Sequence, residues 1–265
     1  MTIRPLTKTS ARRGAPVKAE RDDSALFLTE ALTELNNGAG FLDRLTLDDI
    51  KAVRRVTSSR SFQPGETIFL QGDRHNGIFL IETGQVRTYY AGPSGREITL
   101  AYWHSGNFVG GPEVFKQGLH VWSGVAAVNS TVLHLPGDVL RRMVMTIPAL
   151  AIGIIEGLSF KGQCYSALAQ MLGTRSPTER LAQLLLHLMN LYGVEERDGV
   201  LIAASFTHAD LAHMTGVTRQ SVTISLKRFT ELGILAAHGS NLVIKNAAAL
   251  SEIRDGKLAK TAASD

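Results

Sequence analysis

The chain has 265 residues, of which 44% are hydrophobic and 20% charged, a balance typical of a globular protein with room for two modest domains. No apolar stretch approaches the roughly 20 residues that a membrane-spanning helix needs, which argues against a membrane protein. The single cysteine, Cys164, excludes an internal disulfide framework, an iron–sulfur cluster and a structural zinc site built from several thiolates of one chain. A net charge of +4 and a pI near 9.3 suit a polyanionic partner without proving one.

Residues 1–24 are basic, with six Lys or Arg residues against three acidic ones and almost no apolar pattern. Such a segment cannot bury enough apolar surface to form a core, so we expect a disordered tail. A secretory signal would need an apolar stretch after the basic start, and none is present. We therefore expect a cytoplasmic protein without a membrane partner.

Residues 25–147 are expected to form one domain that begins with two helices, Leu26–Asn36 and Leu47–Arg55, the second capped by Thr46. Residues 64–137 hold 12 of the 25 glycines, which separate short runs of β character. These runs are Thr67–Leu70, Gly77–Glu82, Val86–Tyr90, Glu97–Trp103, Val121–Val128 and Thr131–Leu135. Many short strands between turn signals predict an antiparallel β-roll.

Residues 148–174 predict one long helix, because the β pattern ends at Pro148. Its apolar and small residues follow alternating steps of three and four, the spacing of a coiled-coil seam: Ile155, Leu158, Gly162, Tyr165, Ala169 and Leu172. Gly162 and Ala169 would let a second helix approach closely, so we expect this helix to join two copies of the chain. The alternative is a helix that packs only on its own β-roll.

A second helix is predicted from Ser176-Pro177 to about Leu191, at the start of a domain over residues 175–250. Within that domain, Thr207 is a suitable N-cap for a short helix over Ala209–Thr215. Gly216 then supplies a turn in which a Cβ would be strained, and Thr218 caps another helix that runs to about Leu232.

Two short apolar runs, Ile234–Ala237 and Leu242–Ile244, follow as a β-hairpin. Two capped helices, a turn glycine and a hairpin together predict a winged helix-turn-helix over Phe206–Asn246, and hence double-stranded DNA as a partner. Residues 251–265 are expected to form a C-terminal tail. The fold class is therefore α+β: a β-roll, a long helix and a winged helix-turn-helix.

The outer face of the second helix in this motif would contact DNA. Arg219 and Gln220 are expected to read bases, because Arg pairs with guanine and Gln with adenine through two hydrogen bonds each. Other polar residues are expected to contact phosphates or solvent: Thr207, His208, Thr218, Ser221, Thr223, Ser225, Lys227 and Arg228.

An enzyme is the rival interpretation, since His208, Asp210 and His213 could suggest a metal site. The two histidines are five residues apart and do not share a helix face, and no third ligand is evident. No phosphate-binding glycine loop or nucleophile elbow appears either. We therefore expect no metal and no catalytic residue.

The order of a glycine-punctuated β-roll, a long helix and a winged helix-turn-helix resembles the Crp/Fnr superfamily of bacterial transcription regulators. The matching stretches are PGETIFLQGD (64–73), FLIETGQVRTYY (79–90), GREITLAYWHSGNFVG (95–110) and TERLAQLLLHL (178–188), followed by the helix-turn-helix. The resemblance implies a homodimer that binds a palindromic operator, acts with RNA polymerase and responds to an effector in the roll. This type of β-roll also occurs in regulatory ligand-binding subunits, which is a further alternative.

The effector site departs from the cyclic-nucleotide-binding members of this superfamily. Those members carry a Gly-Glu-Leu turn and then an Arg that clamps the cyclic phosphate, whereas here Gly111 replaces the Glu and no arginine occurs between Arg96 and Arg141. A buried phosphate without a charged donor binds poorly. We therefore expect cyclic AMP and cyclic GMP not to bind.

A small aromatic or carboxylated effector is expected instead, in a pocket of Val109, Gly111, Pro112, Glu113, His120, Trp122, Tyr165 and Ser166. A collapsed roll without a ligand is the alternative. Haem held by His75, His104, His120 or His134 and redox sensing by Cys164 are weaker alternatives.

Overall fold

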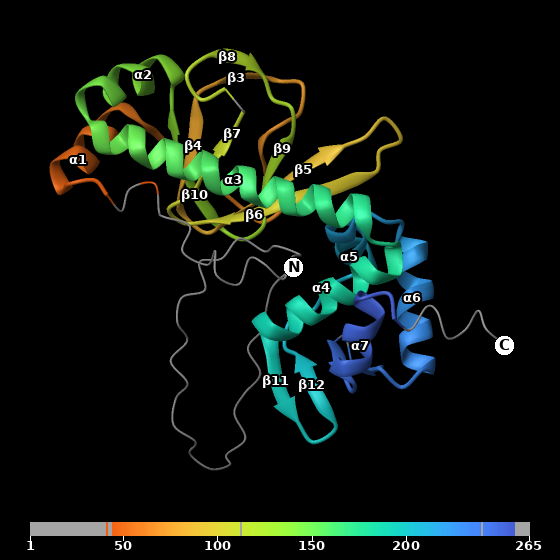
Figure 1. Ribbon diagram of the computed structural model, residues 1–265. Helices are drawn as coiled ribbons and strands as arrows, with labels where there is room; N and C mark the ends of the chain where they lie inside the picture. The colour runs from red at the N-terminus through yellow and green to blue at the C-terminus, as the bar shows by residue number, and fades with distance from the viewer. Residues whose placement is uncertain (1–40, 42–43, 112, 240, 258–265) are drawn as a thin grey trace, which may run out of the picture.

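The computed structural model describes residues 41, 44–111, 113–239 and 241–257. The predicted tail over residues 1–24, the predicted helix Leu26–Asn36 and Pro112 lie outside these residues. Figure 1 shows a β-roll with one long helix, α3, running along it to a mostly helical C-terminal domain. Within the described part of the chain, no helix combines the length and the apolar character needed to cross a bilayer.

The roll consists of antiparallel strands in two four-stranded sheets and one two-stranded sheet. The first sheet has the order β1-β10-β4-β7, with β1 Ser58–Phe62, β10 Ser130–Leu135, β4 Ile78–Thr83 and β7 Phe108–Gly110. The second has the order β2-β9-β5-β6, with β2 Thr67–Phe69, β9 Ser123–Ala126, β5 Gln85–Ala91 and β6 Glu97–His104. The third pairs β3 Arg74–Asn76 with β8 Gln117–Leu119. The six predicted runs each overlap one of these strands, whereas β1, β3, β7 and β8 were not predicted.

Helices α1 Leu47–Val56 and α2 Gly137–Thr146 lie at one end of the roll, from which α3 Pro148–Thr174 runs along it (Figure 1). Thr46 caps α1 as predicted, in a capping box with Asp49. Helix α2 was not predicted. It packs its Leu140 against Leu150 and Ile154 of α3 in an apolar core that also includes strands β4 and β10.

Helix α3 has 27 residues and spans the residues predicted for it. Gly157 has a packing role, because a Cβ there would lie 2.5 Å from Cε1 of Phe108. The missing side chain lets the helix lie close against the roll at this point. Part of the α3 surface is open: Ile155 is 65% and Leu158 38% exposed, and Gly162 and Ala169 are exposed as well. Of the predicted seam, Tyr165 and Leu172 are instead partly buried within the protomer.

The C-terminal domain contains four helices, α4 Pro177–Tyr192, α5 His208–Thr215, α6 Arg219–Glu231 and α7 Ala247–Arg254. They pack around the apolar side chains of Leu184, Leu185 and Phe229. A C-terminal tail was predicted from residue 251, but α7 continues to Arg254. Its Ile253 is buried in this core.

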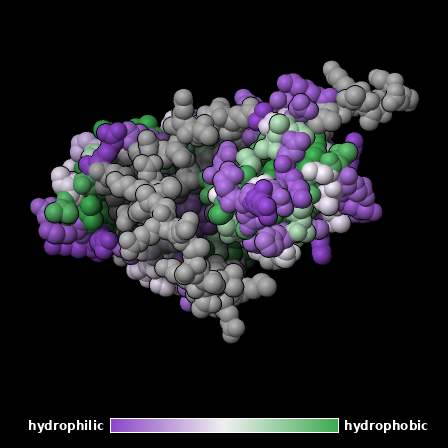
Figure 2. Space-filling view, turned by 90° about the horizontal axis from the view of Figure 1, so that it is seen from below, coloured by the Kyte–Doolittle hydropathy of each residue, from purple (hydrophilic) through white to green (hydrophobic). Residues whose placement is uncertain are grey.

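The predicted wing forms as β13 Leu235–His238 and β14 Asn241–Ile244. It belongs to a four-stranded sheet of order β11-β12-β14-β13. The hairpin of β11 Gly193–Glu196 and β12 Gly199–Ile202 was not predicted, although Asp198-Gly199 is a strong turn signal. Figure 2 shows that hydrophilic residues dominate the viewer's side of this domain, with smaller hydrophobic patches between them. The predicted α+β architecture is confirmed.

Candidate nucleic-acid interface and effector cavity

Helices α5 and α6 form the predicted helix-turn-helix. Thr207 caps α5 in a capping box, in which the Asp210 amide donates to Thr207 Oγ1 and Asp210 Oδ2 accepts from the Thr207 amide. Gly216 ends α5 in the left-handed conformation, with φ 63°. A Cβ there would also lie 3.1 Å from Cδ2 of Leu172, so the turn depends on glycine both for its backbone and for its packing.

The exposed face of α6 begins with Arg219 and Gln220, and α6 lies at the outer edge of the domain (Figure 1). Neither side chain makes a hydrogen bond or ion pair with another described residue, so both are available to a partner. One turn later, Ile224 is 61% exposed on the same side of the helix, a position that the prediction of DNA contacts did not include.

Several predicted DNA contacts are engaged within the motif itself. Thr218 Oγ1 accepts from the Ser221 amide at 3.1 Å and lies 2.8 Å from Ser221 Oγ. His208 Nδ1 lies 2.8 Å from Thr223 Oγ1, which joins the first turn of α5 to α6. Thr218 therefore caps α6 as predicted, and the contact between His208 and Thr223 links the two helices, a role that the sequence alone did not assign to these two residues.

Three further residues refine the predicted interface. Ser225 was expected to contact phosphate or solvent, but it is only 8% exposed and faces the core, so that expectation is wrong. Lys227 is exposed and lies 3.7 Å from Glu231 on the same helix, whereas Arg228 is exposed and forms no ion pair with another described residue. The basic side chains at the exposed surface of α6 are thus Arg219, Lys227 and Arg228.

A cavity of about 340 Å³ lies between the roll and α3. We call it the roll cavity; its lining is formed by Thr88, Trp103, Phe108, Val109, Gly110, Gly111, Trp122, Leu158, Lys161, Gly162 and Tyr165. The volume lies within the range of small-molecule sites. The structure therefore contains a cavity in place of the collapsed roll that was the alternative.

Four of the predicted pocket residues line this cavity: Val109, Gly111, Trp122 and Tyr165. The other described ones do not. Glu113 and Ser166 are exposed at the surface. His120 is buried elsewhere, with its ring 4.3 Å from the ring of Phe69 and 5.3 Å from that of His75. Burial and the neighbouring His75 lower the pKa of His120 to about 4, so it stays uncharged at neutral pH.

Lys161 is the charged residue among the cavity residues that the sequence did not reveal. Its Nζ lies 3.4 Å from the centre of the Trp103 ring and 5.0 Å from that of Phe108, so the ammonium rests on aromatic faces. Burial lowers the pKa of Lys161 to about 7, although the nearby Cys164 acts in the opposite direction. No local sequence motif predicts a buried lysine here, because the residues that surround Lys161 come from strands about 50 residues earlier in the chain.

The haem and redox alternatives receive no support from the described residues. None of the four candidate histidines belongs to the cavity lining, and His134 Nε2 lies 2.7 Å from the carbonyl oxygen of Asn76. Cys164 is buried in the roll core, and burial raises the pKa of its thiol to about 12, which opposes oxidation. Among the described residues, no group of three His, Cys, Asp or Glu side chains is placed to hold a metal ion.

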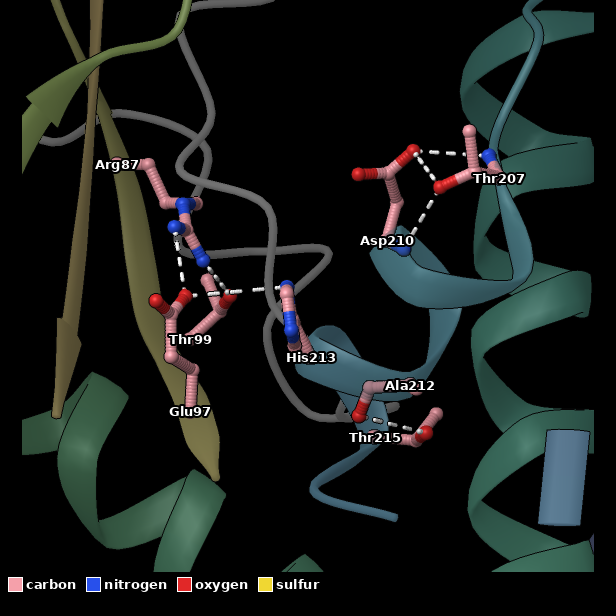
Figure 3. A network of polar contacts seen from close by, with 8 residues as sticks. All are labelled: Arg87, Glu97, Thr99, Thr207, Asp210, Ala212, His213 and Thr215. Carbon is pink, nitrogen blue, oxygen red and sulfur yellow. Dashed lines mark hydrogen bonds and ion pairs between the residues drawn. The ribbon is translucent and has the colours of Figure 1, made fainter. Parts of the chain in front are cut away.

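A polar contact joins the roll to the helix-turn-helix (Figure 3). Arg87 of β5 donates to Glu97 Oε2 at 2.9 Å and to Thr99 Oγ1 at 3.3 Å, both on β6. His213 of α5 places its Nδ1 3.8 Å from the same Glu97 oxygen. Beside this contact lies a cleft of about 450 Å³, whose lining includes Tyr102 from β6 and Asp210 from α5.

Comparison with known proteins assigns both domains. The cyclic nucleotide-binding domain family matches residues 59–146, and the Crp-like helix-turn-helix domain family matches residues 179–253. The global nitrogen regulator of Synechococcus elongatus is 27% identical over 193 residues, which cover 72% of this chain and 87% of that protein. The CRP-like cAMP-activated global transcriptional regulator of Mycobacterium tuberculosis is 22% identical over 221 residues, covering 83% and 98% of the two chains.

A solved structure has the same arrangement of domains. The c-di-GMP responsive global regulator CLP of Xanthomonas campestris superposes with a TM-score of 0.68 at 20% identity, covering 76% of this chain and 100% of that chain. This likeness is one of fold; the helix-turn-helix family and the two relatives named above are regulators rather than enzymes. The chain belongs to the Crp/Fnr superfamily of transcription regulators, with a Crp-like helix-turn-helix as its DNA-binding domain.

Proposed function

We propose that this protein is a homodimeric, sequence-specific transcription regulator whose affinity for a palindromic operator is set by a small effector other than a cyclic nucleotide. The observation that carries the proposal is the pairing of an exposed, unpartnered Arg219 and Gln220 on α6 with a formed cavity beside α3. DNA as the target implies a cytoplasmic site of action, with RNA polymerase as the machinery that such a regulator influences.

The homodimer is supported by the exposed stripe of α3, formed by Ile155, Leu158, Gly162 and Ala169. Apolar and small residues at coiled-coil spacing are the surface that a second copy of the helix would cover. Two copies would present two α6 helices to half-sites about one helical turn apart. Analytical ultracentrifugation of the full chain tests this, and a monomer at micromolar concentration would contradict it.

Substitution of Arg219 tests the DNA interface directly. Because a bidentate Arg–guanine pair contributes about 1–3 kcal/mol of discrimination, Arg219→Ala should weaken operator binding roughly ten- to a hundredfold and relax the preference at one base pair. The operator would first be selected from a random DNA pool, and binding measured by gel shift at fixed salt. Arg141→Ala on α2, also exposed, is the matched control and should bind like the wild type.

A second outcome of the Arg219→Ala experiment would assign a different role to Arg219. An equal loss on every DNA sequence, with a smaller dependence on salt, would make it a phosphate contact. Ile224 supplies an independent readout, since an exposed aliphatic side chain on this face suits the methyl group of thymine. Repeating the selection with Ile224→Ala should lose a thymine preference at one position and leave the others unchanged.

The effector part of the proposal rests on the roll cavity and on the missing arginine in the β6–α2 region. Between Arg96 and Arg141 the sequence has no arginine to clamp a cyclic phosphate. Equilibrium dialysis with cyclic AMP and cyclic GMP should therefore give no binding at micromolar concentration. Binding in that range would restore cyclic nucleotides as effectors and contradict this part of the proposal.

A further inference from the structure

Lys161 is a cation in an apolar enclosure. Its side chain extends from α3 over the Trp103 ring and borders the roll cavity, most of whose other walls are carbon. Its ammonium has no carboxylate or hydrogen-bond acceptor among the described residues. A lysine usually keeps its charged end in water, so this placement needs a reason.

The rest of the lining indicates what the lysine faces. Trp103, Trp122 and Tyr165 surround the cavity with flat aromatic walls, and the ring centres of the last two are 5.8 Å apart. The Thr88 hydroxyl already accepts from Trp103 Nε1 at 2.9 Å, so it offers less to a ligand. A planar, mostly carbon ligand fits such walls, and Lys161 is the cavity's one charged contact among the described lining residues.

We propose that the roll cavity binds a small aromatic carboxylate, with the ring between Trp122, Tyr165 and Trp103 and the carboxylate paired with the Lys161 ammonium. This inference rests on the proposed function, because it names the effector class of the same cavity. The pairing neutralises two charges that would each be unfavourable in an apolar site alone. It also supplies a cationic donor to the cavity, whose other described lining residues are uncharged.

A cyclic nucleotide fits this lining less well. Besides its phosphate, it carries a sugar hydroxyl and the polar edge of a base, which need several hydrogen-bonding partners. The described lining offers few side-chain polar groups beyond Lys161, Tyr165 and the engaged Thr88. Buried polar groups left without partners weaken binding strongly, so the cavity favours a ligand with a single polar end.

The experiment compares acids with their uncharged amides. Calorimetric titration of the full chain at pH 6.5 would use benzoate, indole-3-acetate and naphthalene-2-carboxylate, each beside its carboxamide. At least one carboxylate should bind about ten- to a hundredfold more tightly than its amide, as expected for a charge-assisted contact. Lys161→Met should remove that preference while keeping the aliphatic stem, and Lys161→Arg should retain part of it.

Lys51→Met, at an exposed lysine on α1, is the matched control and should behave as the wild type. Circular dichroism checks that Lys161→Met is folded. Should it not fold, the acid–amide difference of the wild type at pH 6.5 and pH 9 takes its place and should shrink at the higher pH. The inference is overturned if no carboxylate binds, if acids and amides bind equally, if Lys161→Met keeps the preference, or if cyclic AMP binds more tightly than every carboxylate.

Failure of the proposed function gives a different pattern. A carboxylate that binds at Lys161 but does not change operator binding in a gel shift would support the ligand assignment and contradict control of DNA binding. Sequence-specific operator binding without any acid–amide preference would contradict the ligand assignment and still support the DNA-binding part of the proposed function. The titration contains no DNA, so the two outcomes are independent.

Discussion

Strand β6 separates two spaces of opposite character. Trp103 faces the roll cavity, which is lined by aromatic and aliphatic groups around the single charge of Lys161. Tyr102, the preceding residue, faces the cleft against the C-terminal domain, where Arg87, Asp210 and His213 make the lining polar. Successive side chains of a strand point to opposite faces, so one strand contacts both the proposed ligand and the DNA-binding domain. The two functions can therefore be altered separately by substituting adjacent residues.

The largest expected effect is on the cavity side of β6. Trp103 is 1% exposed, so Trp103→Ala should leave an unfilled space and lower the free energy of unfolding by about 3–5 kcal/mol. Tyr102→Ala removes a partly exposed ring and should lower it by less, about 1–2 kcal/mol. Urea unfolding followed by circular dichroism measures both. An equal loss in the two variants would remove the distinction between the faces of β6.

A second prediction concerns the charge of Lys161. Its pKa in the free protein is about 7, below that of an ordinary lysine, and a bound carboxylate should raise it. Binding then takes up a proton above pH 7, so carboxylate affinity should fall by up to about tenfold per pH unit, or about a hundredfold from pH 7 to pH 9. Below pH 7 the affinity should be nearly constant until the ligand itself is protonated.

The neighbours of Lys161 do not titrate in this range. Burial raises the pKa of Cys164 to about 12, and burial also raises the pKa of Tyr165, so both stay protonated. The corresponding amide should bind equally or slightly better at pH 9, which makes it the internal control. A carboxylate affinity that is flat from pH 7 to pH 9 would mean that Lys161 is not its partner.

The contrast between the two spaces also shows what sequence could predict. Thr207, Gly216 and Thr218 act within a few residues of their own positions, through caps and a turn, so the helix-turn-helix was placed within one or two residues. The order of β-roll, long helix and C-terminal domain likewise followed from local glycine spacing and periodicity. Helix α2 and the β11–β12 hairpin were missed despite local signals, namely Asp138 in a first turn and Asp198-Gly199.

The cavity required contacts between distant segments and was only partly predicted. Lys161 of α3 meets Trp103 of β6 because Gly157 lets the helix lie close to the roll, a relation with no local pattern. His120 follows the turn that family resemblance assigned to the pocket, yet its ring stacks on Phe69 instead. The contact between Glu97 and His213 spans two domains and could not be inferred from either alone.

A third prediction tests the polar contact between the domains. Glu97→Gln should weaken the pair with Arg87 and lower the free energy of unfolding by about 1 kcal/mol or less, because both side chains are partly in water. If this contact transmits the effector's influence, the ligand's effect on operator affinity should fall about two- to fivefold, while ligand binding itself stays unchanged. Gel shifts with and without carboxylate measure the ligand's effect on operator affinity, and calorimetry measures ligand binding.

Glu82→Gln is the matched control for Glu97→Gln. Glu82 is 27% exposed against 26% for Glu97, and it also pairs with an arginine, Arg54, but within the β-roll and α1. It should produce a similar small loss of stability without changing the ligand's effect on DNA binding. Equal changes in both variants would assign the effect to general destabilisation rather than to the domain contact.

The smallest expected effect is at the Tyr102 hydroxyl, which has no hydrogen-bond partner among the described residues. Its ring packs against the C-terminal core, so Tyr102→Phe should change the free energy of unfolding at pH 8 by no more than about 0.5 kcal/mol. Burial raises the pKa of Tyr102 to about 12, above its value of about 10 in the unfolded chain. The unfolded state therefore loses its proton first as the pH rises, which lowers the stability of the wild type but not of the variant. At pH 10.5 the variant should be the more stable by up to about 1 kcal/mol, and a variant less stable than the wild type at both pH values would show that the hydroxyl, and not only the ring, holds the domains together.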